Sequence, residues 1–430
     1  MLSSGPAACA GYFWRVKGFS RLIFLLILAG STARMNGELS HQVYVWQRAW
    51  SATVCESVAA HATNFSEIAV LAAEVSWKDK LPRVTRVSAD YQTLVRSGCP
   101  VGLVLRVGPY QGALGDNRSA VDFLAGLAAS LVAEARKNQV QPVELQIDFD
   151  CAESKLDDYR QWLGVVQHRL APLPVTITAL PSWLNSTNFP PLVAVATNYV
   201  LQVHSLEKPT RIDAPFTLCS PAVAKQAVAR AGIVGVPFRV ALPTYTYIVA
   251  FHSDGQFFGL AAEQPRNGWP AGTQTRDMSA DPVVMSSLVR YWSTNATSSL
   301  RGIIWYRLPV AVDNLNWRWP TLAAIVAGRE PHESFHSVAR RVEPGLVEIS
   351  LVNDGELDIS SRLIVKVRWS EARLVAGDGL RGFELADESD SAAQFQNHQR
   401  AFRLRAGEKI VVGWLRFDRD REVQLEAQPF

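Results

Sequence analysis

The chain has 430 residues, of which 48% are hydrophobic and 19% are charged, and this is the composition of a globular protein with a sizeable core. Such a length predicts two or three domains, or one large barrel with an appendage. The formal net charge is only +3, and the sequence has no stripe of clustered lysines and arginines. These features argue against a nucleic-acid partner.

Residues 1–33 have the pattern of a cleaved export signal. Basic residues between positions 15 and 21 precede the apolar run Leu22–Gly30, and the small residues Ser31, Thr32 and Ala33 follow it. The apolar run is shorter than the roughly 20 residues that a membrane-spanning helix needs, which favours a cleaved signal over an uncleaved anchor. We therefore expect an exported protein, periplasmic or secreted, that is formally neutral and has no stable membrane span after cleavage.

Beyond this signal the chain has four cysteines, Cys55, Cys99, Cys151 and Cys219. An even number is compatible with disulfides in an oxidising compartment, and buried free thiols are the alternative. We expect a Cys151–Cys219 disulfide, because Cys151 directly follows a predicted strand and Cys219 directly precedes a predicted helix on the same rim. No spacing of cysteine and histidine residues indicates a metal site, and no cofactor is expected.

Apolar, β-rich segments alternate with helical patterns over residues 40–330. The predicted strands are Val43–Arg48, Ile68–Val75, Gly102–Val107, Val143–Asp150, Val175–Leu180, Tyr199–His204, Phe238–Pro243 and Gly302–Leu308. The clearest predicted helices are Asn117–Asn138, Ser154–Leu170, Ser220–Ala231 and Pro282–Trp292. Eight strand–helix repeats predict a (β/α)8 barrel. An open doubly wound sheet is the alternative, but no glycine-rich phosphate loop follows an early strand.

Two further segments depart from the strand–helix pattern. The stretch between Tyr245 and Asp281 is a long insertion, in which residues 252–255 predict a hairpin that overhangs the active face. Residues 334–430 alternate apolar and polar side chains, with turn signals such as Asn353-Asp354-Gly355. This pattern predicts a small antiparallel β-sandwich with a structural or glycan-binding role.

The most informative stretch is VELQIDFDC at residues 143–151, because side chains on a strand alternate between its two faces. One face carries Glu144, Gln146, Asp148 and Asp150, and the acids come at the end of the strand. In a barrel that end lies at the active face. Asp148 and Asp150 would be about 7 Å apart, close enough for each to perturb the proton affinity of the other.

The ends of the other predicted strands carry a chemically coherent set of residues. Glu74 is a further candidate catalytic carboxylate, and the candidate substrate-binding residues are Trp46, Arg106, Trp183, Gln202, His204, Tyr245, Trp305 and Tyr306. Aromatic faces stack on pyranose rings, while amides and acids bond to hydroxyl groups. The set therefore predicts a polysaccharide or oligosaccharide as the ligand. Arg106 lies in an otherwise apolar strand, so we expect it to pair with a carboxylate of this set.

Structural roles remain open for several of these residues. Asp148 and Asp150 have an alternative as structural acids paired with Arg106 or Arg48. Trp305 could instead pack in the barrel core, and His204 could be an interior histidine that is held by hydrogen bonds.

The fourth predicted strand, residues 143–150, resembles a known motif. VELQIDFD resembles the fourth-strand motif of family 18 chitinase-like barrels, whose usual form is D-G-x-D-x-D-x-E. The resemblance implies that Asp150 is the general acid, that Asp148 supports it, and that Trp305 floors a sugar subsite. Val143 and Gln146 replace the first two aspartates of the motif, and the acid is one methylene shorter than the usual glutamate.

The wider chain resembles an uncharacterised bacterial family of exported barrel proteins without an assigned activity, on the segments VYVWQRAW, LQIDFDC, TALPSWL, LQVHSL, LPTY and WYRLP. Together these features predict a glycoside-hydrolase-like enzyme that acts on an extracellular or cell-wall polysaccharide. The second group in the reaction would be Glu74 or the N-acetyl oxygen of the substrate. The alternatives are a non-catalytic glycan-binding barrel protein of the bacterial envelope and a structural envelope protein.

Overall fold

The computed structural model of the chain describes residues 39–78, 81–110, 112, 118–149, 151–262, 268–398 and 402–429. The expected signal over residues 1–33 and the candidate acid Asp150 lie outside the described residues. Within the described ranges, no helix combines the length and the apolar character needed to cross a membrane.

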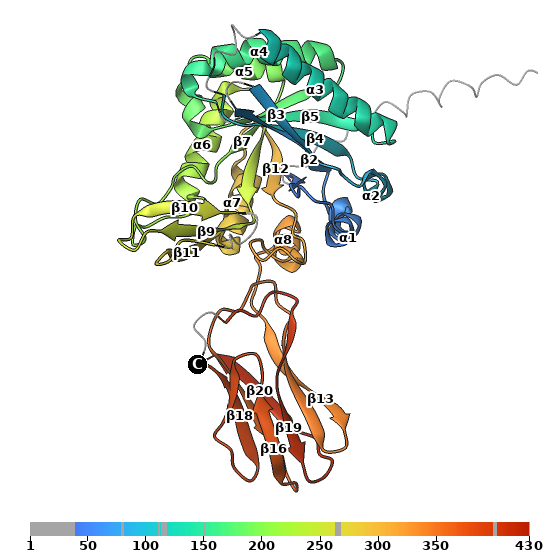
Figure 1. Cartoon of the computed structure of the whole chain (residues 1–430), viewed down its shortest axis with the longest axis vertical. Coiled ribbons are helices and arrows are strands. Elements are labelled where there is room, and N and C mark those ends of the chain that lie inside the picture. The colour runs from blue at the N-terminus through green and yellow to red at the C-terminus, as the bar shows by residue number, and fades with distance from the viewer. Residues whose placement is uncertain are drawn as a thin grey trace, which may run out of the picture. The chain divides into compact units, whose positions relative to one another are not determined.

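Eight parallel strands close into a barrel, as predicted from the sequence (Figure 1). They are β1 (Ser40–Val45), β2 (Glu67–Lys78), β4 (Val101–Val107), β5 (Pro142–Phe149), β6 (Val175–Ala179), β7 (Tyr199–Gln202), β8 (Phe238–Pro243) and β12 (Leu300–Tyr306). Strand β1 pairs with both β12 and β2, and these pairings close the sheet. An additional strand, β3 (Leu81–Arg86), pairs antiparallel with the end of β2 and was not predicted.

A helix follows each barrel strand before the next barrel strand begins. The helices are α1 (Ala52–His61), α2 (Tyr91–Ser97), α3 (Arg118–Lys137), α4 (Leu156–Leu170), α5 (Phe189–Ala196), α6 (Pro221–Val234), α7 (Pro282–Asn295) and α8 (Trp319–Val326). The local sequence explains their limits. Helix α6 starts with proline at its first position and ends at Gly235, whose φ of +79° suits a residue without a Cβ. At α7 the Asp281 side chain accepts hydrogen bonds from the free amides of Val283 and Val284.

The interior of the barrel has its own small hydrophobic cluster, separate from the core under the helices. It joins residues from six of the barrel strands, β1, β2, β4, β7, β8 and β12. Its strand members are Tyr44, Ala69, Leu71, Val104, Val200, Ala241 and Ile304. Neighbouring strand residues such as Val43, Ile303 and Trp305 belong instead to the core that includes the helices. Side chains thus alternate between the interior and the helices along each strand.

A buried ion network lies in the interior below this cluster. Arg239 of β8 donates from Nη2 to both carboxylate oxygens of Glu144 at 2.8 and 2.9 Å, and from Nη1 to Gln42 Oε1 at 2.5 Å. The Glu67 carboxylate lies 3.7 Å from Arg239 Nη1. Position 102, beside this network, requires glycine because a Cβ there would lie 2.3 Å from Glu67 Oε1. The interior therefore holds two carboxylates around one guanidinium.

This excess of acid perturbs Glu67. Burial, and next the charge of Glu144, raise the pKa of Glu67 from 4.5 to about 8, although Arg239 opposes the shift. The pKa of the folded protein is above that of the unfolded chain, so the folded protein binds more protons between these two values. The free energy of unfolding should therefore fall as the pH rises from about 4.5 to about 8.

We expect Glu67→Gln to remove this pH dependence, because a neutral amide has no proton to lose. Each unit of pKa difference corresponds to about 1.4 kcal/mol, so the wild type should lose several kcal/mol relative to the variant between pH 5 and pH 8.5. Denaturant unfolding at both pH values measures this difference. Parallel loss of stability in the two proteins would contradict the assignment to Glu67.

The insertion after β8 contains the predicted hairpin. Strand β9 (Thr246–Phe251) pairs antiparallel with β10 (Phe257–Ala261) and with β11 (Gln274–Ser279), in a three-stranded sheet. The turn at residues 252–255 joins β9 to β10, and the Gly255 amide donates to His252 O at 2.9 Å. Leu260 of β10 reaches the barrel cavity described below.

The C-terminal region forms two four-stranded antiparallel sheets, as predicted for a β-sandwich. One sheet contains β13 (Phe335–Glu343), β14 (Leu346–Asn353), β19 (Lys409–Phe417) and β16 (Leu374–Gly379). The other contains β17 (Phe383–Ala386), β18 (Ala392–Asn397), β15 (Leu363–Arg368) and β20 (Gln424–Pro429). Their inner faces share one hydrophobic core. Before β19, Leu404 forms an isolated antiparallel bridge with Ile359.

The expected Cys151–Cys219 disulfide is not formed, and this prediction is wrong in the structure. Both residues are buried cysteines without a disulfide. Cys219 donates from Sγ to Val203 O at 3.4 Å. Cys151 follows β5 and Val203 follows β7, so the Cys219 thiol is held by another part of the rim. Burial also raises the pKa of Cys219 to about 12, which keeps it a thiol.

We expect Cys151 and Cys219 to react with a thiol reagent only after denaturation, and without prior reduction. Burial and the raised pKa of Cys219 leave little thiolate for the reaction in the folded protein. Mass spectrometry of peptides alkylated before and after denaturation, with and without a reductant, measures this. If labelling required the reductant, the two cysteines would form the predicted disulfide.

Candidate functional site

A cavity of about 400 Å³ lies at the C-terminal ends of the barrel strands. It brings together seven residues predicted from the sequence, Trp46, Arg106, Asp148, Gln202, His204, Tyr245 and Tyr306. They come from the ends of β1, β4, β5, β7, β8 and β12 or from the residues directly after them. Active sites of (β/α)8 enzymes lie at this face.

Aromatic rings form one wall of the cavity. The Tyr306 ring centroid lies 5.1 Å from that of Trp46 and 5.4 Å from that of Tyr245, in edge-to-face arrangements. Tyr44 packs against both Trp46 and Tyr306, with centroids 5.5 and 5.8 Å away. The Trp46 Nε1–H has no hydrogen-bond partner among the residues that the structure describes. The wall therefore combines apolar ring surface with a buried donor.

Alternating charges run along the rim beside this wall. Arg48 donates to the Glu74 carboxylate from Nε at 2.5 Å and from Nη2 at 2.9 Å. Arg106 Nη1 lies 3.4 Å from Glu74, and its Nε lies 3.8 Å from Asp148. The Thr178 hydroxyl donates to Asp148 Oδ1 at 2.8 Å. These five residues follow one another on β1, β2, β4, β5 and β6, or just after them, and we call them the rim charge row. The expected carboxylate partner of Arg106 is confirmed.

Glu74 is already occupied within this row. Both of its oxygens accept from Arg48, one also contacts Arg106, and its side chain is 18% exposed. It is not among the residues that line the cavity. Of the two described candidate carboxylates, Asp148 therefore lines the cavity, and Glu74 holds the arginine next to it.

His204 is a buried, neutral side chain. Its Nδ1 lies 3.2 Å from the Tyr245 hydroxyl, and its ring stacks on Tyr306 with centroids 5.8 Å apart. Burial lowers the pKa of His204 to about 3. Burial, and then Tyr247, raise the pKa of Tyr245 well above its usual value. His204 and Tyr245 are therefore uncharged at neutral pH, and they offer a ring nitrogen and a hydroxyl group.

Two predicted sugar platforms lie elsewhere. Trp183 is 1% exposed and packs near Tyr159 and Phe189 in the core under the helices. Trp305 is fully buried on the helix-facing side of β12, where its Nε1 donates to His41 Nδ1 at 3.0 Å. Neither ring has an exposed face for a ligand, so their prediction as platforms is wrong in this structure. The alternation along β12 places Tyr306, the next residue, in the cavity.

The cavity also contains residues that were not proposed as its ligands. They are Tyr44, Thr178, Ser205, Lys208, Ala241, Tyr247 and Leu260. Two of them carried a signal in the sequence. Tyr44 stands two residues before Trp46 on the same face of its strand, and Thr178 has the corresponding place on β6. Ser205 donates to or accepts from the Tyr247 hydroxyl at 2.8 Å, but it lies in a loop that no periodicity predicts.

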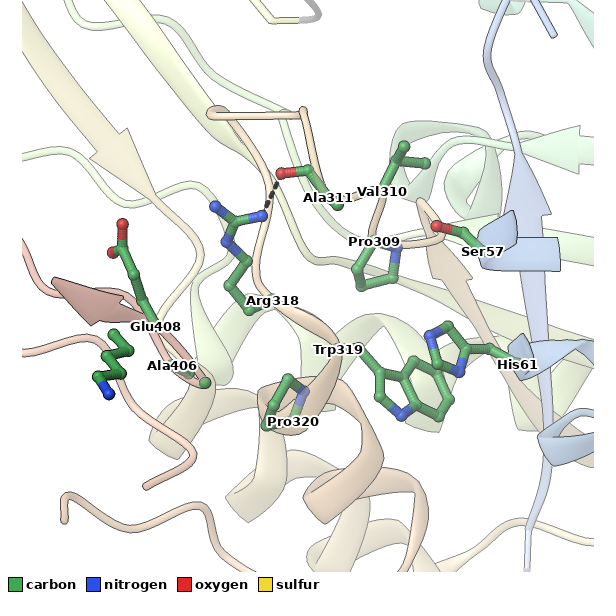
Figure 2. Close-up of a pocket in the computed structure, with 12 residues that line it drawn as sticks. Ser57, His61, Pro309, Val310, Ala311, Arg318, Trp319, Pro320, Ala406 and Glu408 are labelled. Carbon is green, nitrogen blue, oxygen red and sulfur yellow. Dashed lines mark hydrogen bonds between the residues drawn. The ribbon is translucent and has the colours of Figure 1, made fainter. Parts of the chain in front are cut away.

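A second cavity, of about 500 Å³, shares no lining residue with the first. Figure 2 shows its stacked His61 and Trp319 rings, whose centroids are 3.8 Å apart, and the Arg318 side chain directed at Ala311 O. Its described lining has Glu408 as the one carboxylate and includes none of the predicted site residues. The barrel cavity is therefore the candidate site, because it contains the carboxylate, the arginine and the aromatic rings that were proposed from the sequence. Within the described ranges, no group of three or more His, Cys, Asp or Glu side chains is placed to hold a metal ion.

Comparison with one solved structure, that of SleL, supports the barrel fold. The spore cortex-lytic enzyme SleL of Bacillus cereus superposes with a TM-score of 0.51 at 10% identity, over 69% of this chain and 75% of SleL. A chitinase from Chromobacterium violaceum has a TM-score of 0.48 at 15% identity, over 68% of this chain and 98% of that chain. No curated protein matches the chain in sequence.

Two family profiles match the chain in sequence. Residues 98–311 match a family described as "Domain of unknown function (DUF3142)", and residues 336–418 match one described as "Domain of unknown function (DUF8456)". The first match covers most of the barrel strands, and the second lies in the sandwich. The resemblance to an uncharacterised family is thereby confirmed: the chain joins a (β/α)8 barrel that carries a DUF3142 match to a β-sandwich that carries a DUF8456 match.

Proposed function

We propose that the barrel cavity binds an extracellular or cell-wall polysaccharide and that the protein hydrolyses one of its glycosidic bonds. The observation that carries this proposal is the pairing of Asp148 with a wall of tyrosine and tryptophan rings in one cavity at the C-terminal face. Sugar rings bind to such surfaces through their apolar faces, and their hydroxyls bond to carboxylates and amides.

In the proposed reaction Asp150 protonates the glycosidic oxygen as the C–O bond breaks, and water supplies the hydroxyl that completes the new reducing end. Asp148 lies two residues earlier in the chain, near the end of β5, and stabilises the positive charge that develops on the sugar. Thr178 and Arg106 hold the Asp148 carboxylate in place. These roles extend the resemblance of VELQIDFD to the family 18 chitinase-like motif.

The second group in the reaction is best supplied by the substrate. Glu74 was the protein candidate, but Arg48 and Arg106 occupy its oxygens, and it does not line the cavity. Releasing it would break a bidentate ion pair. We therefore propose that the N-acetyl oxygen of the substrate assists, and that Glu74 positions Arg106. Export across the membrane, through the expected signal over residues 1–33, would bring the protein to this substrate.

The first experiment measures release of reducing ends from a panel of bacterial polysaccharides. We expect release by the wild type and a loss of at least about a hundredfold for Asp150→Asn, because the amide has no proton of suitable acidity to donate. Asp148→Asn should lower the rate with little change in affinity. Equal rates for the wild type and Asp150→Asn would remove Asp150 from the reaction.

A matched pair on β12 tests the location of the site. Tyr306→Leu should weaken oligosaccharide binding by about tenfold, because the residue lines the cavity. Trp305→Phe should leave binding unchanged and lower the free energy of unfolding by about 1–3 kcal/mol, because that ring packs in the core. Calorimetric titration and denaturant unfolding of both variants measure these effects. The opposite pattern would place the sugar subsite at Trp305.

A non-catalytic glycan-binding barrel is the second candidate. It is favoured by two observations, the one-methylene-shorter acid at position 150 and the ion-paired state of Glu74. It predicts that an oligosaccharide binds to the wild type and to Asp150→Asn with the same affinity, and that neither protein releases reducing ends. The reducing-end assay and the titration together separate the two functions.

A further inference from the structure

One arginine of the sandwich reaches the loop that follows the last barrel strand. Arg405 is 7% exposed and donates four hydrogen bonds to residues 313–316. Three go to carbonyl oxygens, of Asp313 at 3.4 Å and of Asn314 and Asn316 at 3.1 Å, and one goes to Asn314 Oδ1 at 2.9 Å. The Asp358 carboxylate lies 4.0 Å from Arg405 Nε. A nearly buried guanidinium is thus held mainly by the backbone of this loop.

The same loop is bonded to the end of β8. The Thr246 amide donates to Leu315 O at 2.8 Å, and the Trp317 amide donates to Thr244 O at 2.9 Å. Tyr245, between these two positions, pairs with Asn316 in a backbone bridge. Residues 315–317 therefore hold the backbone on both sides of Tyr245, whose ring lines the cavity.

The loop is also bonded to the end of β12. Asn316 donates from Nδ2 to Arg307 O at 3.1 Å and to Leu308 O at 3.2 Å. The Asp313 carboxylate accepts from Arg307 Nη2 at 2.5 Å. Arg307 directly follows Tyr306, so the loop fixes the backbone next to the second aromatic residue of the cavity wall.

We infer that Arg405 is a positioning residue for the barrel cavity: it braces residues 313–316 from the sandwich, and this loop fixes Tyr245 and Tyr306. The sandwich then acts on the site through a rigid contact instead of binding glycan itself. The inference rests on the proposed function only where it concerns the ligand, because the rigidity of the loop is measurable without one. Removing Arg405 leaves three carbonyl groups without their donor, and the loop loosens.

The experiment compares amide hydrogen exchange at Thr246 and Trp317 in the full chain. We expect Arg405→Ala to speed exchange at both amides by about tenfold or more, and Arg405→Lys to have an intermediate effect because it keeps the charge but loses the planar fork. The control is Arg403→Ala. Arg403 is exposed, and its described hydrogen bond goes to Asp358 within the sandwich, so exchange at the loop should not change.

A second variant covers the case in which Arg405→Ala does not fold. Asn314→Ala removes the 2.9 Å bond from the barrel side and should speed the same amides by a smaller factor. If the wild type binds an oligosaccharide, Arg405→Lys should weaken that binding by several-fold, and Arg403→Ala should not. Unchanged exchange at Thr246 and Trp317 in folded Arg405 variants would overturn the inference, as would unchanged affinity despite faster exchange. If the wild type binds no oligosaccharide, the proposed function fails and exchange alone decides whether Arg405 braces the loop.

Discussion

A side chain on a strand of a closed barrel points either into the interior or toward the surrounding helices, and this alternation decides which residues of the chain reach the site. On β5 it sends Glu144, Gln146 and Asp148 inward, where they bond to Arg239, Tyr44 and Thr178 in turn from the bottom of the interior to the cavity. On β12 the same rule brings Tyr306 to the cavity and sends Trp305 to the helices. The chemistry of the interior therefore changes with depth: a buried ion network, then a hydrophobic layer, then the rim.

Much of the fold was predictable because its signals are local. Each of the eight barrel strands was visible as a short β-rich run, and the proline and cap residues of α6 and α7 mark where those helices begin. The site was predictable where alternation and strand ends sufficed, as for Asp148, Arg106 and Trp46. The prediction of Trp305 as a sugar platform was wrong because a shift of one residue along a strand moves a side chain to the opposite face. The disulfide was wrong because its two cysteines were placed from chain order alone, which does not give the direction of either thiol. The loop residues Ser205 and Lys208 carry no periodic signal.

Arg239, Arg106 and Arg405 differ in their surroundings and in their roles. Arg239 is 6% exposed and is bonded to Glu144 and Gln42, so removing the Glu144 carboxylate would leave this buried charge with only the Glu67 carboxylate, 3.7 Å away. Arg106 stands at the cavity with its side chain 41% exposed, where its carboxylate contacts of 3.4 and 3.8 Å join two acids in one row. Arg405 donates mostly to carbonyl oxygens, which orient its guanidinium group without neutralising its charge. Depth and partner type thus separate an arginine of the core, an arginine of the site and an arginine that joins the sandwich to the barrel.

The rim charge row also constrains the chemistry of the site. Because Arg48 and Arg106 share Glu74, the protein uses one of its candidate carboxylates to fix a cation beside Asp148. A mechanism with two opposed protein carboxylates would have to break that arrangement in every turnover. A mechanism in which the substrate supplies the second group leaves the row intact, and the same row would serve a barrel that only binds glycan. Under the proposed function, the ion pairs of the row therefore favour a substrate that supplies its own nucleophile, and the acid at position 150 is the group on which the difference between binding and hydrolysis depends.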